Sequence, residues 1–97
     1  MVDLKDLKSN FPIEEKKVNV DSWKGEVKIK RLTLEETSRY YQIQKNEGSI
    51  SGMIQAVSDC LVEPKISVEE LKSLNESSFK GVEEIFGFLM EFSNEKK

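Results

Sequence analysis

The sequence contains no histidine, a single cysteine, two prolines and five glycines that never cluster. Histidine is the commonest general base and the commonest zinc ligand, so its absence removes most catalytic and metal-binding arrangements. Cys60 has neither a disulfide partner nor a histidine to activate it, and its apolar neighbours predict a buried structural thiol. The scattered glycines form no phosphate-binding loop. We therefore expect a protein that is not an enzyme and that binds neither a metal nor a cofactor.

Adjacent carboxylates are the remaining candidate metal ligands. They occur as glutamate pairs at positions 35–36, 69–70 and 83–84. Neighbouring residues on a helix point about 100° apart, so the two members of each pair do not share a site. The pairs are typical of solvated helix faces.

Long apolar runs are also missing. None approaches the ~18–20 residues that a membrane-spanning helix requires. The opening residues, from Met1 to Asp6, lack the positive stretch followed by an apolar stretch that marks a signal peptide. A lone cysteine is typical of a reducing compartment. We expect a cytoplasmic protein that does not bind a membrane.

Charge is abundant and unevenly distributed. Charged residues make up 34% of the 97 residues and hydrophobic residues 37%. Residues 1–48 carry a net charge of +1 and residues 49–97 a net charge of −4, which together give −3. Six cations lie between Lys16 and Arg31, where only Asp21 and Glu26 are acidic. This stretch could form a local basic patch, but the acidic chain as a whole is a poor general nucleic-acid binder.

Residues 16–31 show the period of two that is typical of β-strands. In two short runs β-branched side chains alternate with polar ones, and a turn-rich stretch that includes Trp23 and Gly25 separates the runs. Gly25 is the residue expected to adopt a left-handed conformation. We predict a hairpin with one β-branched face and one lysine-bearing face. The predicted cross-strand pairs are Val20 with Val27 and Val18 with Ile29.

The rest of the chain carries helix signals. Thr33 with Glu36, and Ser67 with Glu70, form two capping boxes. Residues 46–48 supply a helix stop that ends in glycine. The predicted helices cover residues 34–45, a segment from about Ser49 that Pro64 ends, a short segment after Ser67, and a segment from about Ser77 or Ser78 to Phe92.

These elements predict one α+β domain in which an N-terminal β-hairpin packs against four to five short α-helices. Packing on helices is required because a two-stranded hairpin is not stable alone. The predicted parts are a loosely ordered arm (1–15), the hairpin (16–31), a helical part (33–92) and a polar tail (93–97).

Three features are candidates for binding a partner. Trp23, at the turn, either folds back over a helix or is held out as an anchor. Lys28 and Lys30 lie on the basic hairpin face, where they either contact a partner or protect an exposed strand edge.

The last predicted helix has an apolar arc wider than one small core requires. Its main stripe contains Phe79, Val82, Phe86 and Leu89, with further apolar residues partly outside it. The helix is either central and buried or forms a surface for self-association or for a partner. The candidate partner-binding residues are therefore Trp23, Lys28, Lys30, Ile85, Phe88 and Phe92.

Several short motifs follow one another along the chain. They are the spaced Leu4 and Leu7, Val18-Asn19-Val20, Trp23-Lys24-Gly25, residues 27–36 (VKIKRLTLEE), Cys60-Leu61-Val62-Glu63-Pro64 and Ser67-Val68-Glu69-Glu70-Leu71. Their order, over roughly residues 4–92, resembles the small tail assembly chaperones of long-tailed bacteriophages and prophages.

This resemblance implies a non-enzymatic assembly factor in the cytoplasm of a bacterial host. Such chaperones bind the long helical tape-measure protein and keep it from aggregating until tail-tube subunits polymerise around it. A longer product, made by translational frameshift, often recruits the tube subunit. The alternative from a different class is a small phage or bacterial regulatory or adaptor module that binds DNA or a host protein through its basic hairpin.

Overall fold

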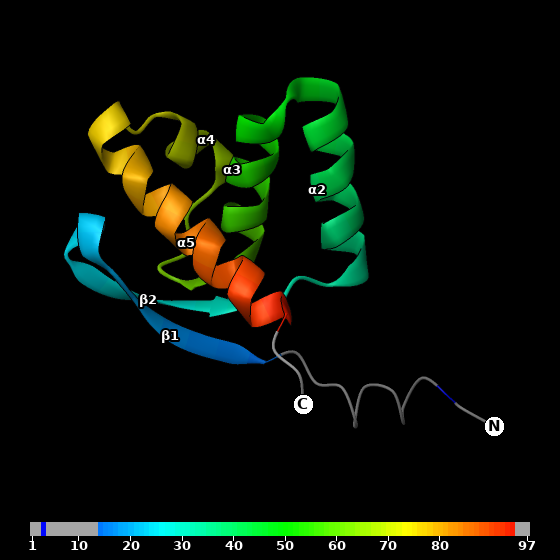
Figure 1. Ribbon diagram of the computed structural model, residues 1–97, viewed down its shortest axis with the longest axis horizontal. Coiled ribbons are helices and arrows are strands. Elements are labelled where there is room, and N and C mark those ends of the chain that lie inside the picture. Colours follow the sequence, from blue (N-terminus) through cyan, green and yellow to red (C-terminus); the bar gives the residue numbers. More distant parts are fainter. Residues whose placement is uncertain (1–2, 4–13, 95–97) are drawn as a thin grey trace.

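The computed structural model describes Asp3 and residues 14–94, and it has the predicted α+β fold (Figure 1). The predicted arm falls outside the described residues except for Asp3, Glu14 and Glu15, as do residues 95–97 of the predicted tail. The elements in chain order are β1 (Glu15–Val20), the 3-10 turn η1 (Asp21–Trp23), β2 (Gly25–Lys30), α2 (Leu34–Glu47), α3 (Ser49–Cys60), β3 (Leu61–Glu63), α4 (Val68–Lys72) and α5 (Glu76–Asn94).

The predicted hairpin is confirmed, but its register differs from the prediction by two residues. Val18 pairs with Val27, and Lys16 pairs with Ile29. The turn takes up only residues 21–24, and Lys24, not Gly25, adopts the left-handed conformation with φ 54°. A shift by an even number keeps every side chain on its face. The β-branched face is therefore buried as predicted, with exposures of 6% or less.

A third strand replaces the last turn of the helix predicted to reach Pro64. Helix α3 ends at Cys60, and β3 pairs antiparallel with β2, placing Leu61 opposite Ile29 and Glu63 opposite Lys28. Pro64 disfavours helical geometry at Glu63, the residue before it, and Glu63 is extended in β3. Strand β3 then occupies the hydrogen-bonding edge of β2 that a two-stranded hairpin would leave open.

The two predicted capping boxes and the predicted stop at Gly48 form, whereas α5 extends past the predicted end at Phe92 to Asn94. The hydroxyl of Thr33 accepts from the Glu36 amide at 3.1 Å, and the Glu36 carboxylate accepts from the Thr33 amide at 2.9 Å. The same reciprocal pair joins Ser67 and Glu70 at 3.1 and 3.0 Å. Gly48, with φ 104°, lies between α2 and α3, where a side chain would be strained.

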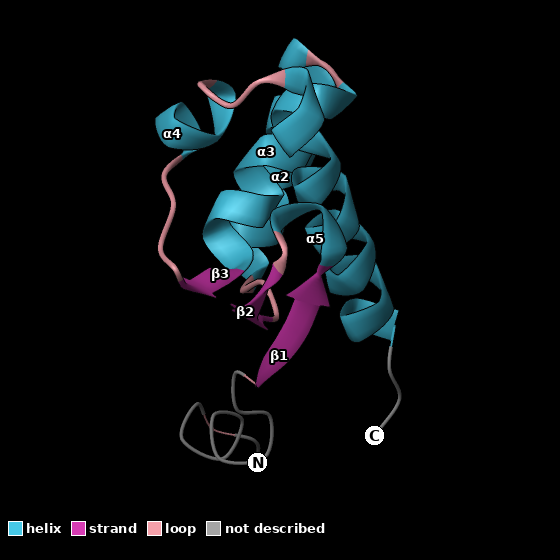
Figure 2. Ribbon diagram, turned by 90° about the vertical axis from the view of Figure 1, so that its left-hand side faces the viewer, coloured by secondary structure: helices cyan, strands magenta, loops and turns pink. Residues whose placement is uncertain are grey.

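The hydrophobic core lies between one face of the sheet and helices α3 and α5, which lie over it (Figures 1 and 2). The buried face of α5 is rotated from the predicted stripe, because Ile85 and Phe92 are buried whereas Phe79 and Phe86 are only half-buried. The most buried core side chains include Val20, Ile29, Val57, Leu61, Leu71, Val82, Ile85 and Leu89.

Helix α2 is peripheral, and none of its residues is buried. It packs on α3 where Gly52 allows close approach, since a Cβ at Gly52 would lie 2.9 Å from Gln44 Cβ and 3.2 Å from Tyr40 Cε1. Arg39 of α2 reaches the Asp59 carboxylate of α3 at 3.4 Å. Tyr40 also contacts Phe86 of α5, with ring centroids 5.8 Å apart.

We predict that Gly52→Ala separates α2 from α3, because the new methyl group meets the Gln44 backbone as well as its side chain. The free energy of unfolding should fall by about 1–3 kcal/mol, measured by urea denaturation. Gly87→Ala is the control, since nothing lies within 4 Å of its new Cβ. Equal stability changes in the two variants would contradict the packing described for Gly52.

Candidate protein-binding surface

Trp23 folds back onto α5 and is half-buried there. Its Nε1 donates a hydrogen bond to the Ser78 carbonyl at 2.8 Å. Its ring lies against Gly81, where a Cβ would overlap Nε1 and Cε2 and lie 2.5 Å from Cδ1. The neighbouring Ser22 amide donates to Glu84 Oε2 at 3.1 Å. Of the two alternatives for Trp23, the structure therefore selects the folded-back one.

Trp23 also lines an open groove of about 580 Å³, referred to below as the Trp23 groove. Its apolar lining comes from Trp23, from Ile66 in the β3–α4 connection and from Leu74 between α4 and α5. Leu74 is one of the few large hydrophobic side chains of the described residues that are exposed. Three serines and Glu70 complete the lining: Ser22, Ser73 and Ser78.

A second groove of about 340 Å³ shares Leu74 with the first. Its apolar lining includes Ile50, which is 60% exposed, and the half-buried Phe79. The two grooves lie on either side of Leu74, so together they form an apolar surface that crosses the α4–α5 turn. The remaining apolar lining residues of the second groove are Ile54 and Leu71.

The Ile66 segment that forms one wall of the Trp23 groove is tied to α3. Ser58 is a buried polar residue, and its hydroxyl donates to the Ile66 carbonyl at 2.8 Å. A buried hydroxyl needs such a partner, so this bond sets the position of the connection. One wall of the groove is thus tied to α3.

Glu70 is exposed and lines the Trp23 groove. Hydrogen bonds from the Ser67 backbone amide and side chain lower the pKa of its carboxyl group. At neutral pH the groove therefore carries a full negative charge beside an apolar floor.

The lysines of the hairpin lie beside carboxylates rather than forming an isolated basic face. Lys30 Nζ is 2.6 Å from Glu36 Oε1, and Lys28 Nζ is 3.8 Å from Glu15 Oε1. Lys28 is also flanked by Glu63 on β3. The Lys30 side chain is only 19% exposed, and its ammonium group is paired with Glu36.

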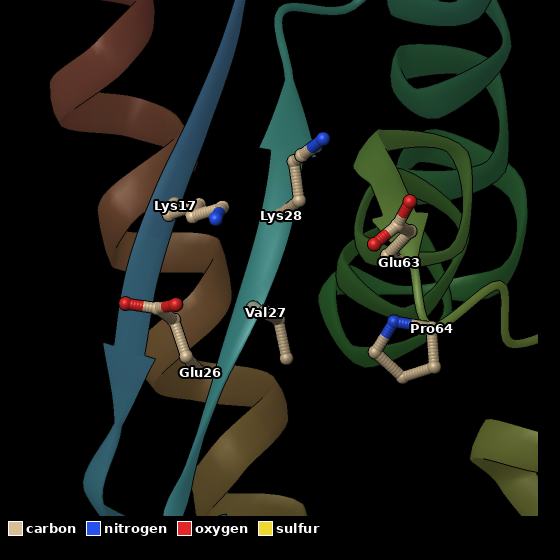
Figure 3. Close-up of a pocket in the computed structure, with 6 residues that line it drawn as sticks. All are labelled: Lys17, Glu26, Val27, Lys28, Glu63 and Pro64. Carbon is tan, nitrogen blue, oxygen red and sulfur yellow. The ribbon is translucent and has the colours of Figure 1, made fainter.

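A shallow pocket of about 390 Å³ lies on this outer face of the sheet. Figure 3 shows the residues that line it. Lys17 and Lys28 lie side by side on neighbouring strands, with Glu63 on the third strand. Both signs of charge line the pocket, with Glu26 the second acid. Such a surface has no strong preference for an anion.

The predicted α5 residues do not form an exposed surface. Ile85 and Phe92 are 0% and 2% exposed, so the prediction that they lie at a partner surface is corrected. Phe92 is covered by Arg31, whose Cζ is 4.5 Å from the ring centroid. Phe88 is half-buried against the core. The wide apolar arc of α5 is buried or half-buried because this helix packs against both the sheet and α3.

The candidate nucleophile and metal ligands of the sequence were Cys60 and the paired glutamates. Burial raises the pKa of the Cys60 thiol to about 12, as expected of a structural cysteine. No group of three or more candidate ligands lies together among the described residues. No helix in that part of the chain is long and apolar enough to cross a membrane.

Comparison with known proteins gives no match for this chain, whether among protein-family models, curated proteins or solved structures. The resemblance to tail assembly chaperones therefore rests on the sequence motifs alone.

The structure brings only Trp23 of the six predicted residues into the groove. Ile66, Glu70 and Leu74 also line the groove, and the sequence did not predict them as binding residues. One signal was present in the sequence, because Leu74 is an apolar residue between a helix that begins at a capping box and the start of the next helix. Ile66 gives no such signal, since its position depends on the bond from Ser58.

We predict that Gly81→Ala displaces Trp23 from α5, because the added methyl group occupies the position of the indole ring. The variant should lose about 1–3 kcal/mol of unfolding free energy, and its tryptophan fluorescence should shift to the red as the ring enters water. Gly87→Ala, on the same helix with open space around it, should be more stable than the parent by about 0.5–1 kcal/mol. An unchanged emission spectrum for Gly81→Ala would contradict this docking.

The Lys30–Glu36 pair predicts a pH dependence of stability. Partial burial raises the pKa of Glu36, but the hydrogen bonds from Lys30 and Thr33 outweigh it, so the pKa is lowered from 4.5. A lowered folded-state pKa adds stability that is fully present above pH 4.5 and is lost as the pH falls through the folded-state value.

Glu36→Gln, which preserves a capping box, should therefore cost about 1 kcal/mol at neutral pH and progressively less below about pH 4. Urea denaturation across this pH range measures the difference. Glu47→Gln, an exposed change at the other end of α2, is the control. A cost for Glu36→Gln that is the same at every pH would argue against the ion pair.

Proposed function

We propose that the chain is a non-enzymatic phage tail assembly chaperone that binds the tape-measure protein and assists assembly of the tail tube around it. The observation that carries the proposal is the Trp23 groove together with its continuation past Leu74. Both are open, largely apolar surfaces at one end of a charge-rich chain. A chaperone of a long helical protein needs such grooves for apolar side chains and a charged exterior that keeps the complex in solution.

The order of motifs supports the same proposal, because Trp23 and the Ser67–Glu70 capping box both belong to the resemblance and both contribute to the groove. Tail-tube subunits and a host-cytoplasmic location enter the proposal through the resemblance alone. The alternative, in which the basic hairpin binds DNA or a host protein, has less support. Lys28 and Lys30 lie beside carboxylates, which reduces the positive potential that a phosphate backbone requires.

Co-expression with a tape-measure protein of a long-tailed phage tests the proposal. The chain should raise the soluble yield of that protein and co-purify with it. Leu74→Asp should reduce both effects severalfold, because it places a charge at the junction of the two grooves. Leu34→Asp is the matched control, since Leu34 is 91% exposed and lies on α2, away from both grooves. No gain in yield and no co-purification would refute the proposal.

A further inference from the structure

One charged side chain of the described residues lines the Trp23 groove, and it is the acidic Glu70. Asp21 adjoins Ser22 of the lining and is exposed, and Glu84 accepts a hydrogen bond from the Ser22 amide. Exposed lysines adjoin other lining residues, namely Lys24, Lys65 and Lys72. A ligand that brings a cation beside Glu70 itself gains Coulomb energy, and one that brings an anion there loses it.

The second groove does not add a preference for one sign of charge. Lys72 and Glu76 both line it, so its rim carries one cation and one anion. Its contribution is apolar surface from Ile50 and Phe79. Because Leu74 is shared, a ligand that fills both grooves crosses this side chain and places one apolar side chain on each side of it.

We propose that the Trp23 groove and its neighbour bind an amphipathic segment of a partner protein with two apolar anchor side chains and a lysine or arginine beside the anchor that enters the Trp23 groove. Glu70 is the residue that selects the cation. This inference rests on the proposed chaperone function for the partner's identity, but its chemistry is set by the groove alone. The match of a cation to Glu70 sets the specificity, and apolar burial supplies most of the affinity.

Trp23 makes the inference measurable without a label, because it is the only tryptophan of the chain and it lines the groove. The probes are two synthetic amphipathic peptides of about 15 residues with leucine anchors four residues apart. They differ only in carrying lysine or glutamate next to one anchor. Binding is followed by Trp23 fluorescence and by the NMR signal of its indole N–H, which is hydrogen-bonded to Ser78.

Glu70→Gln removes the charge and keeps an amide oxygen that can accept from the Ser67 amide, so α4 retains its capping box. The matched control is Glu69→Gln, which removes the same charge from the adjacent position outside the groove lining. The lysine peptide should bind the parent chain more tightly than the glutamate peptide. Glu70→Gln should weaken the lysine peptide about twofold to fivefold, and Glu69→Gln should leave it within about 1.5-fold.

Salt provides an independent readout. Raising the ionic strength from about 0.05 to about 0.5 M should bring the two peptides to similar affinities, because an exposed charge pair is screened while apolar contacts are not. Equal affinity of the two peptides at low salt, equal effects of Glu70→Gln and Glu69→Gln, or no response of Trp23 to either peptide would each overturn the inference. These outcomes are distinct from failure of the chaperone function, which the tape-measure co-expression measures separately.

Discussion

The docking of Trp23 on Gly81 connects the two halves of the molecule. The hairpin presents the indole of Trp23 at its turn. Helix α5 presents Gly81, where a Cβ could not be accommodated beside the ring. The indole hydrogen bond to the Ser78 carbonyl spans 55 residues of sequence, and a bond of this kind adds about 1 kcal/mol to the burial of the ring. Because α5 is held at the hairpin turn, its buried face is directed onto the sheet and α3.

The same contact explains why a groove exists at this end of the molecule. Trp23 packs on α5 and is only half-buried, so it also lines the groove together with Ile66. Helix α4 has only five residues and does not fill the space beside it. Leu74 is then left at the α4–α5 turn with 37% of its surface exposed. The residue that stabilises the fold therefore also contributes the apolar floor of the proposed binding surface.

Charge has a different role at the opposite end of the hairpin. Lys30 and Glu36 join β2 to the first turn of α2, and Arg39 and Asp59 join α2 to α3. Since α2 buries none of its residues, these polar contacts and the close approach at Gly52 hold it in place. Much of the basic charge that is concentrated between residues 16 and 31 is thus used inside the chain.

Local features of the sequence were sufficient to predict most of the helices and strands. The capping boxes, the glycine stop at Gly48 and the alternation of β-branched residues depend on neighbours along the chain, and all of them formed. The absence of histidine and the burial of Cys60 were likewise readable without coordinates. The hairpin register follows from the turn geometry at residues 21–24, where Lys24 takes the left-handed conformation. Only the tertiary structure decided the third strand, the buried face of α5 and the position of Trp23. These three depend on contacts between segments distant in sequence, such as Trp23 with Gly81 or Leu61 with Ile29, and local propensity carries no information about such contacts.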